Sequence, residues 1–250
     1  MTDEHGHSHG HETIELLKDN LSFVLVALAV IVAVIALAKV AEMLLLKKKN
    51  EKNTGWSAKK IACVGLFSAV GGALAIIEIP LPFLPGFYLL DLSEIAGMMA
   101  AFLLGPVAGV VVEFIKTVLH ILLHGTHSAF VGDFASFVLG CAYIIPASFI
   151  YLWKKTKRNA LTGLITGALV LVVFGAFFNA FYLIPKFATL YGVDMDSIIA
   201  MGTAINPAIK DLGTLIAFAT VPFNVLKGLI ITVIVFLIYK PLSRLYRKIG

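Results

Sequence analysis

Seven apolar segments run along the chain, separated by short stretches that hold most of its polar residues. They are Leu21–Leu46, Ile61–Ile79, Ser93–Leu104, Pro106–Leu123, Phe130–Trp153, Leu161–Ile184 and Leu212–Tyr239. About 20 apolar residues in a helix suffice to cross the hydrocarbon core of a bilayer. The pattern therefore predicts an all-α integral membrane protein, in which a six-helix unit follows one extra N-terminal helix.

Composition supports a membrane protein, since 59% of the 250 residues are hydrophobic, 14% are charged and the mean hydropathy is +0.94. Soluble domains carry a much larger charged fraction. The net charge of +5 does not indicate nucleic-acid binding, because the basic residues form short clusters between the apolar segments. Fourteen of the 20 Lys and Arg lie in three such clusters, which are Lys47, Lys48, Lys49, Lys52, Lys59 and Lys60, then Lys154, Lys155, Lys157 and Arg158, then Lys240, Arg244, Arg247 and Lys248.

These clusters predict the orientation of the chain, because cytoplasmic loops are enriched in Lys and Arg. Seven spans place all three clusters on one side of the cell membrane, so we expect a cytoplasmic C-terminus and an extracellular N-terminus. The predicted organisation is a histidine-rich tail over 1–20, an extra transmembrane helix over 21–46, a basic cytoplasmic linker over 47–60 and a six-helix domain over 61–250.

The tail carries histidines at alternate positions, His5, His7, His9 and His11. Neutral imidazoles are good ligands for zinc and other transition metals, so the tract is a candidate metal site. A solvated tail with incidental metal affinity explains the same pattern.

Asn224 and Lys227 lie in the middle of the last apolar segment, three residues apart, so they share one helical face. A lysine at bilayer depth costs about 3 kcal/mol or more unless it meets a partner or water. Pro222 cannot donate to the helical ladder and predicts a kink beside them. The trio predicts an intramembrane ligand site, with a structural ion pair or a lysine reaching the interface as the alternatives.

Further polar groups recur on the fourth to sixth segments. Glu113, Lys116, His120 and His124 share one helical face, which indicates a polar stripe facing the bundle or, alternatively, a proton relay. Thr126 at the outer end of this segment is a candidate for the pocket mouth.

Two more positions predict ligand contacts near the outer ends of the spans. Asn179 and Tyr182 can hydrogen-bond a heterocycle and stack on it, and Asp133 can accept hydrogen bonds from ligand hydroxyls or cap its helix. No phosphate-binding loop or hydrolase motif is present, so we expect a protein that is not an enzyme. The two cysteines, Cys63 and Cys141, are expected to be inert thiols.

Several of these stretches resemble those of one family. They are the segment around Leu90-Asp91-Leu92-Ser93-Glu94-Ile95, then Phe102 to Gly109, Glu113 to Lys116, Phe178 to Pro185 and Pro222 to Gly228. From about Trp56 onward the chain is similar to the substrate-binding S components of energy-coupling factor (ECF) vitamin transporters, and most to the riboflavin subgroup. Such an S component binds its vitamin at the outer face and joins a transmembrane T component and two cytoplasmic ATPases.

The resemblance implies roles for particular residues. Asn224 and Lys227 match the flavin-binding pair of the family, while Phe87, Tyr88, Leu89 and Asn179 correspond to ligand contacts by position alone. Ala69 and Ala73 match the small-residue motif that docks on the T component. Riboflavin is then the transported ligand and no cofactor is implied.

The extra helix and the histidine tail are not needed by such a six-helix unit. They leave two alternatives open, an S component for FMN or FAD, and a metal-ion transporter that uses the histidine tract.

Overall fold

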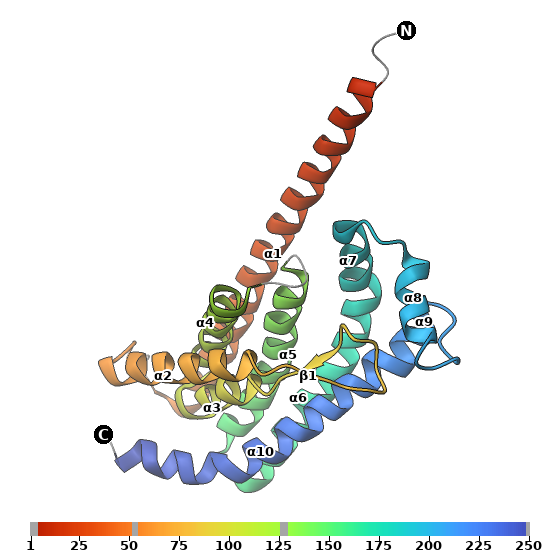
Figure 1. Cartoon of the computed structure of the whole chain (residues 1–250). Helices are drawn as coiled ribbons and strands as arrows, with labels where there is room; N and C mark the ends of the chain where they lie inside the picture. Colours follow the sequence, from red (N-terminus) through yellow and green to blue (C-terminus); the bar gives the residue numbers. More distant parts are fainter. Residues whose placement is uncertain (1–4, 52–54, 126–129, 249–250) are drawn as a thin grey trace.

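The computed structural model describes residues 5–51, 55–125 and 130–248, with side chains from residue 21 onward except that of Tyr191. The long helices are α1 (His5–Lys49), α2 (Ala58–Ala75), α4 (Pro106–His124), α5 (Val131–Trp153), α6 (Lys157–Phe178) and α10 (Val221–Lys248). The shorter elements are the strands β1 (Ile79–Pro80) and β2 (Leu89–Leu90), the helices α3 (Glu94–Leu104), α7 (Ile184–Tyr191), α8 (Met195–Thr203) and α9 (Leu212–Leu215), and the π turns η1 (Asn179–Leu183) and η2 (Ile216–Thr220). In Figure 1, α1 projects from one side of the bundle and α10 runs along its lower edge.

The described residues form six helices that are long and apolar enough to span a membrane, together with the short apolar helix α3. The predicted all-α membrane fold is therefore confirmed. With 11 residues, α3 is about 16 Å long, roughly half of the hydrocarbon thickness. Non-helical backbone at membrane depth is tolerated only where protein buries it or where it lines a cavity. The segment leading into α3 is buried at Leu90 and Ser93 and lines a cavity at Asp91.

The core lies between α3, α5, α6 and α10. Tyr143 of α5 is fully buried and its hydroxyl is 2.7 Å from that of Thr232 on α10. Phe102 of α3 stacks on Tyr151 of α5, with ring centroids 4.3 Å apart. Helix α3 is buried almost all round, because α2, α4, α5 and α10 all contact it.

Two helices that frame the interior are interrupted by π turns, and each π turn ends two residues before a proline. The Ile184 amide donates to the Asn179 carbonyl in η1, and the Val221 amide donates to the Ile216 carbonyl in η2. A proline ring would clash with the carbonyl four residues earlier in a regular α-helix. The wider turn moves that carbonyl aside, so the irregularity predicted at Pro222 takes the form of a π turn.

Helix α1 packs along α4 and α5. Its Glu42 accepts a hydrogen bond from the Val107 amide at 3.3 Å and pairs with Lys60 of α2 at 3.5 Å. Gly105, the residue before α4, has a φ of 109° and no side chain to cap the helix. Glu42 therefore supplies a negative charge at the N-terminus of α4, where the helix dipole favours one.

The three basic clusters meet at one end of the molecule, as their distribution predicted. Lys48 lies 3.5 Å from the ring centroid of Trp153, the residue before the second cluster. Lys59 donates to the Tyr246 carbonyl within the third cluster at 2.9 Å. The three chain segments are therefore neighbours in space.

Two sequence predictions need correction. The second span ends at Ala75 rather than Ile79, because Ile79 and Pro80 form β1 and pair antiparallel with Leu90 and Leu89 of β2. The stretch between the sixth and seventh apolar segments, where the hydrophobic pattern predicted no helix, contains α7 and α8. Figure 1 shows these two helices side by side near α9.

We predict that Glu42→Ala lowers the stability of the folded protein by about 1 kcal/mol, the usual cost of losing a helix cap. Thermal unfolding in detergent would show this as a lower Tm. The exposed Glu51 makes a matched control, and Glu51→Ala should leave the Tm unchanged. Equal Tm values for Glu42→Ala and the unmodified protein would show that the contact to α4 does not stabilise it.

Candidate functional site

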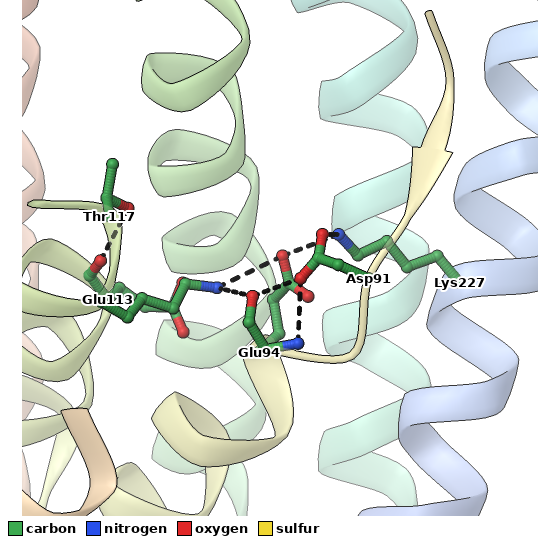
Figure 2. A network of polar contacts seen from close by, with 7 residues as sticks. Asp91, Glu94, Glu113, Thr117 and Lys227 are labelled. Atoms are coloured by element: carbon green, nitrogen blue, oxygen red, sulfur yellow. Dashed lines mark hydrogen bonds and ion pairs between the residues drawn. The ribbon is translucent and has the colours of Figure 1, made fainter. Parts of the chain in front are cut away.

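Lys227 reaches from α10 to two carboxylates near the start of α3. Its Nζ is 3.0 Å from Asp91 Oδ2 and 2.8 Å from Glu94 Oε1. Figure 2 shows Lys227 extending toward Asp91, which sits on the irregular segment between β2 and α3. The ion pair thus ties this segment to the middle of a transmembrane helix.

A second lysine continues the network on the other side of Glu94. Lys116 of α4 lies 2.8 Å from Glu113 and 3.5 Å from Glu94, and it donates to the Ser93 hydroxyl at 2.6 Å. Its side chain is 1% exposed and that of Glu113 is not exposed at all. Buried charges are tolerated only when they are paired and hydrogen-bonded, and here each lysine contacts two carboxylates.

Two glycines make room for the Glu113 carboxylate. A Cβ atom on Gly97 of α3 or on Gly140 of α5 would overlap it. The close approach of three helices around one buried charge therefore requires the absence of a side chain at both positions.

A cavity of about 510 Å³ lies over this charged floor. This is within the range of about 300–1,000 Å³ that is typical of small-molecule sites. Aromatic rings form part of its wall: Tyr88 lies 4.6 Å from Phe87 and 5.3 Å from Phe223 between ring centroids, and Phe187 of α7 is 6.5 Å from Phe87. The Tyr88 hydroxyl is fixed by Thr220 of η2 at 2.5 Å.

Two amides face the cavity from the irregular helices. Asn179 opens η1 and donates to the Gly175 carbonyl at 2.8 Å. Asn224 is 2% exposed, and its Nδ2 has no hydrogen-bond partner among the described residues. A buried donor without an acceptor costs about 1–3 kcal/mol. The Asn224 amide is therefore suited to donate a hydrogen bond to a ligand.

A third polar group lies one helical turn beyond Lys116 on α4. His120 Nδ1 is 2.9 Å from Asp133 Oδ1 of α5, and its Nε2 is 3.6 Å from Glu78 Oε1, in the segment between α2 and β1. All three residues line the cavity. The polar stripe on α4 thus faces the interior of the bundle.

Most of the predicted ligand residues lie together on the cavity wall. They are Phe87, Tyr88, Leu89, Asp133, Asn179, Asn224 and Lys227. Tyr182 does not line the cavity, and its ring stacks on Phe178 instead, with centroids 5.6 Å apart. The reason is η1, since residues three apart in a π turn no longer share the face that they share in an α-helix. Thr126 lies outside the described residues.

Several ionisable residues on the cavity wall were not predicted from the sequence to contact a ligand. They include Glu78, Asp91, Glu94 and His120. A signal for the acids was available: Lys116 and Lys227 within apolar helices need counter-charges. Asp91, just before α3, and Glu94, the first residue of α3, were the candidates.

The metal prediction stays untested. The side chains of His5, His7, His9 and His11 lie outside the described residues. Within the part of the chain that the structure describes, no group of three or more His, Cys, Asp or Glu is arranged to hold a metal ion. Cys63 and Cys141 are free thiols.

The small residues of α2 lie on two different faces of the helix. Gly71 and Gly72 pack inward, where a Cβ atom would approach Lys116 and Leu119 to 3.3 and 3.0 Å. Ala69 and Ala73 are exposed on the outer face, next to the exposed Val70. The glycines thus explain the internal packing, and the alanines are free for contact with another molecule.

Together, the fold and the site define a multi-pass membrane protein with an internal small-molecule cavity. Residues 59–239 match the family model of the ECF transporter substrate-specific component. The chain belongs to this family, whose members are transporter subunits without an ATPase of their own.

Individual relatives agree with this assignment. The chain is 31% identical to the riboflavin transporter RibU of Staphylococcus aureus, over 76% of this chain and 94% of that protein. It is 27% identical to the riboflavin transporter FmnP of Bacillus subtilis, over 72% and 90% of the two chains. A solved structure of the S component of a bacterial ECF transporter matches with a TM-score of 0.59 and 30% identity, covering 75% of this chain and 96% of that one.

We predict that Lys227→Met lowers the free energy of unfolding by about 3 kcal/mol, because it leaves two buried carboxylates short of a partner. Adding Asp91→Asn should restore part of the loss, since the charges are then closer to balance. A double-mutant cycle by thermal unfolding in detergent measures the coupling. Strictly additive effects of the two substitutions would contradict the coupled network.

Proposed function

We propose that this chain binds riboflavin in the cavity and serves as the riboflavin-specific S component of an ECF importer. The observation that carries the proposal is a buried amide without a hydrogen-bond partner, that of Asn224, which lines the same cavity as the paired Lys227 and the aromatic rings. A flat heterocycle with carbonyl groups on one edge suits this arrangement. The riboflavin transporters among the relatives support the same ligand.

The apolar wall and the polar groups of the cavity contact different parts of the flavin. The isoalloxazine ring packs on the aromatic and aliphatic wall formed by Phe87, Tyr88, Leu89 and Phe223, where burial of apolar area supplies the affinity. Its carbonyl edge accepts hydrogen bonds from Asn224 and Lys227. Asn179 of η1 contributes a further amide, near Asn224, since both side chains lie next to Gly175.

The outer face of the membrane is the entry side in this proposal. The cavity is bounded by the segment Gly86–Leu89 and by α7 and α8, and the positive-inside rule places the basic end in the cytoplasm. The N-terminus is then extracellular and the C-terminus cytoplasmic.

The exposed face of α2 is the docking surface for the T component, which joins two cytoplasmic ATPases in this family. Ala69 and Ala73 let a partner helix approach closely, and packing between small residues drives helix association in membranes. ATP hydrolysis by the partner subunits then drives inward release of the vitamin.

Asn224→Ala is expected to weaken riboflavin binding by about 1–3 kcal/mol, because the ligand carbonyl loses its buried donor. Fluorescence quenching titration of the detergent-purified protein, stripped of ligand, measures this change. Tyr182→Phe is the control, since Tyr182 lies off the cavity and should leave the affinity unchanged. If the unmodified protein neither carries flavin absorbance nor quenches riboflavin fluorescence, the proposed function is wrong.

Ala69→Trp should abolish riboflavin uptake by cells that contain the T component and ATPases, while purified Ala69→Trp protein still binds riboflavin. The bulky ring prevents close approach of the partner helix. Leu169→Trp, on an exposed face of α6, is the control and should preserve uptake. Normal uptake by the Ala69→Trp protein would exclude this docking surface.

A further inference from the structure

On the cavity wall, the imidazole of His120 lies between two carboxylates. His120 contacts Asp133 at 2.9 Å and Glu78 at 3.6 Å, and these three residues come from α4, α5 and the segment before β1. The side chain of Asp133 is 6% exposed and that of Glu78 is 25% exposed. A neutral imidazole has a single N–H and can donate to only one of these carboxylates at a time.

Among the described residues, the cavity wall carries an excess of negative charge. Four carboxylates line it, those of Glu78, Asp91, Glu94 and Asp133, against the ammonium groups of Lys116 and Lys227. Both lysines are already paired with carboxylates in the floor network. Even with His120 protonated, the acids on the wall outnumber the cations.

We propose that Glu78, His120 and Asp133 form a subsite that accepts an uncharged, hydroxyl-bearing tail of the ligand and rejects a phosphorylated one. This inference rests on the proposed flavin-binding function and adds its selectivity. Ionised carboxylates only accept hydrogen bonds, so hydroxyl groups suit them as donors. The ribityl chain of riboflavin offers four hydroxyls.

A phosphate ester fails at this subsite for two reasons. It carries about −1.5 to −2 charges at neutral pH, and like charges repel strongly in a partly desolvated cavity. Its oxygens are also mainly acceptors, so they cannot satisfy the two carboxylates. Lys116 and Lys227 are already paired with carboxylates, so neither ammonium group is available to neutralise the phosphate.

The test compares three flavins that share the ring but differ in the tail: riboflavin, riboflavin 5′-phosphate and lumiflavin, which has only a methyl group. Fluorescence quenching on the full-length purified protein should give a Kd for the phosphate ester at least about tenfold above that for riboflavin, the effect of one charged hydrogen bond lost. Asp133→Asn with Glu78→Gln should reduce this ratio about tenfold, because both charges are removed. The Kd for lumiflavin should not change.

Asp196→Asn is the matched control, since Asp196 is an exposed acid on α8 that does not line this cavity. It should leave the ratio of the two Kd values unchanged. Riboflavin and its phosphate binding equally well to the unmodified protein would overturn the subsite, and so would a double variant that weakens all three flavins alike. Failure of every flavin to bind would instead overturn the proposed function itself.

Discussion

The buried ion network that joins α3, α4 and α10 is the constraint on which the interior depends. Two lysines and three carboxylates lie within the bundle, and each lysine contacts two of the acids. An unpaired charge at this depth would be costly, so the three chain segments must hold their positions relative to one another. The network therefore sets both the floor of the cavity and the path of the segment that leads into α3.

The cavity is made by irregular backbone packed among regular helices. The Asp91–Ser93 segment is non-helical and tied to Lys227 and Lys116, while η1 and η2 widen two of the surrounding helices. Two of these deviations place a polar group on the cavity wall, namely Asp91 and Asn179. The third, η2, places the Thr220 hydroxyl where it holds Tyr88 of the wall. Irregular turns of this kind are frequent at functional sites in membrane helices.

The extra helix α1 has a structural contact of its own. It covers α4 and α5, and through Glu42 it meets the N-terminus of α4. Because α4 carries Glu113, Lys116 and His120, the position of α1 bears on the helix that supplies the floor and one end of the cavity. Its other face is apolar and exposed, as expected for a helix that borders lipid.

The order of the long apolar helices followed from the sequence, because a 20-residue apolar run has only one inexpensive structure in a bilayer. Asn224 and Lys227 were evident as candidate site residues for the same reason, because polar groups in such a run need a ligand or a partner. The basic clusters likewise predicted that their three segments share one end, which the contacts of Lys48 and Lys59 confirm.

Only the tertiary structure decided which groups meet. Asp91 and Glu94 became partners of Lys227 through contacts 136 and 133 positions apart in the chain, which no local pattern encodes. Tyr182 lies off the cavity because η1 changes the helical phase, and a period of 3.6 residues cannot anticipate that change. Spacing determined the elements of this protein, because hydrophobicity and helix geometry act locally. The cavity depended on long-range pairing of buried charges, whose geometry exists only after the helices pack.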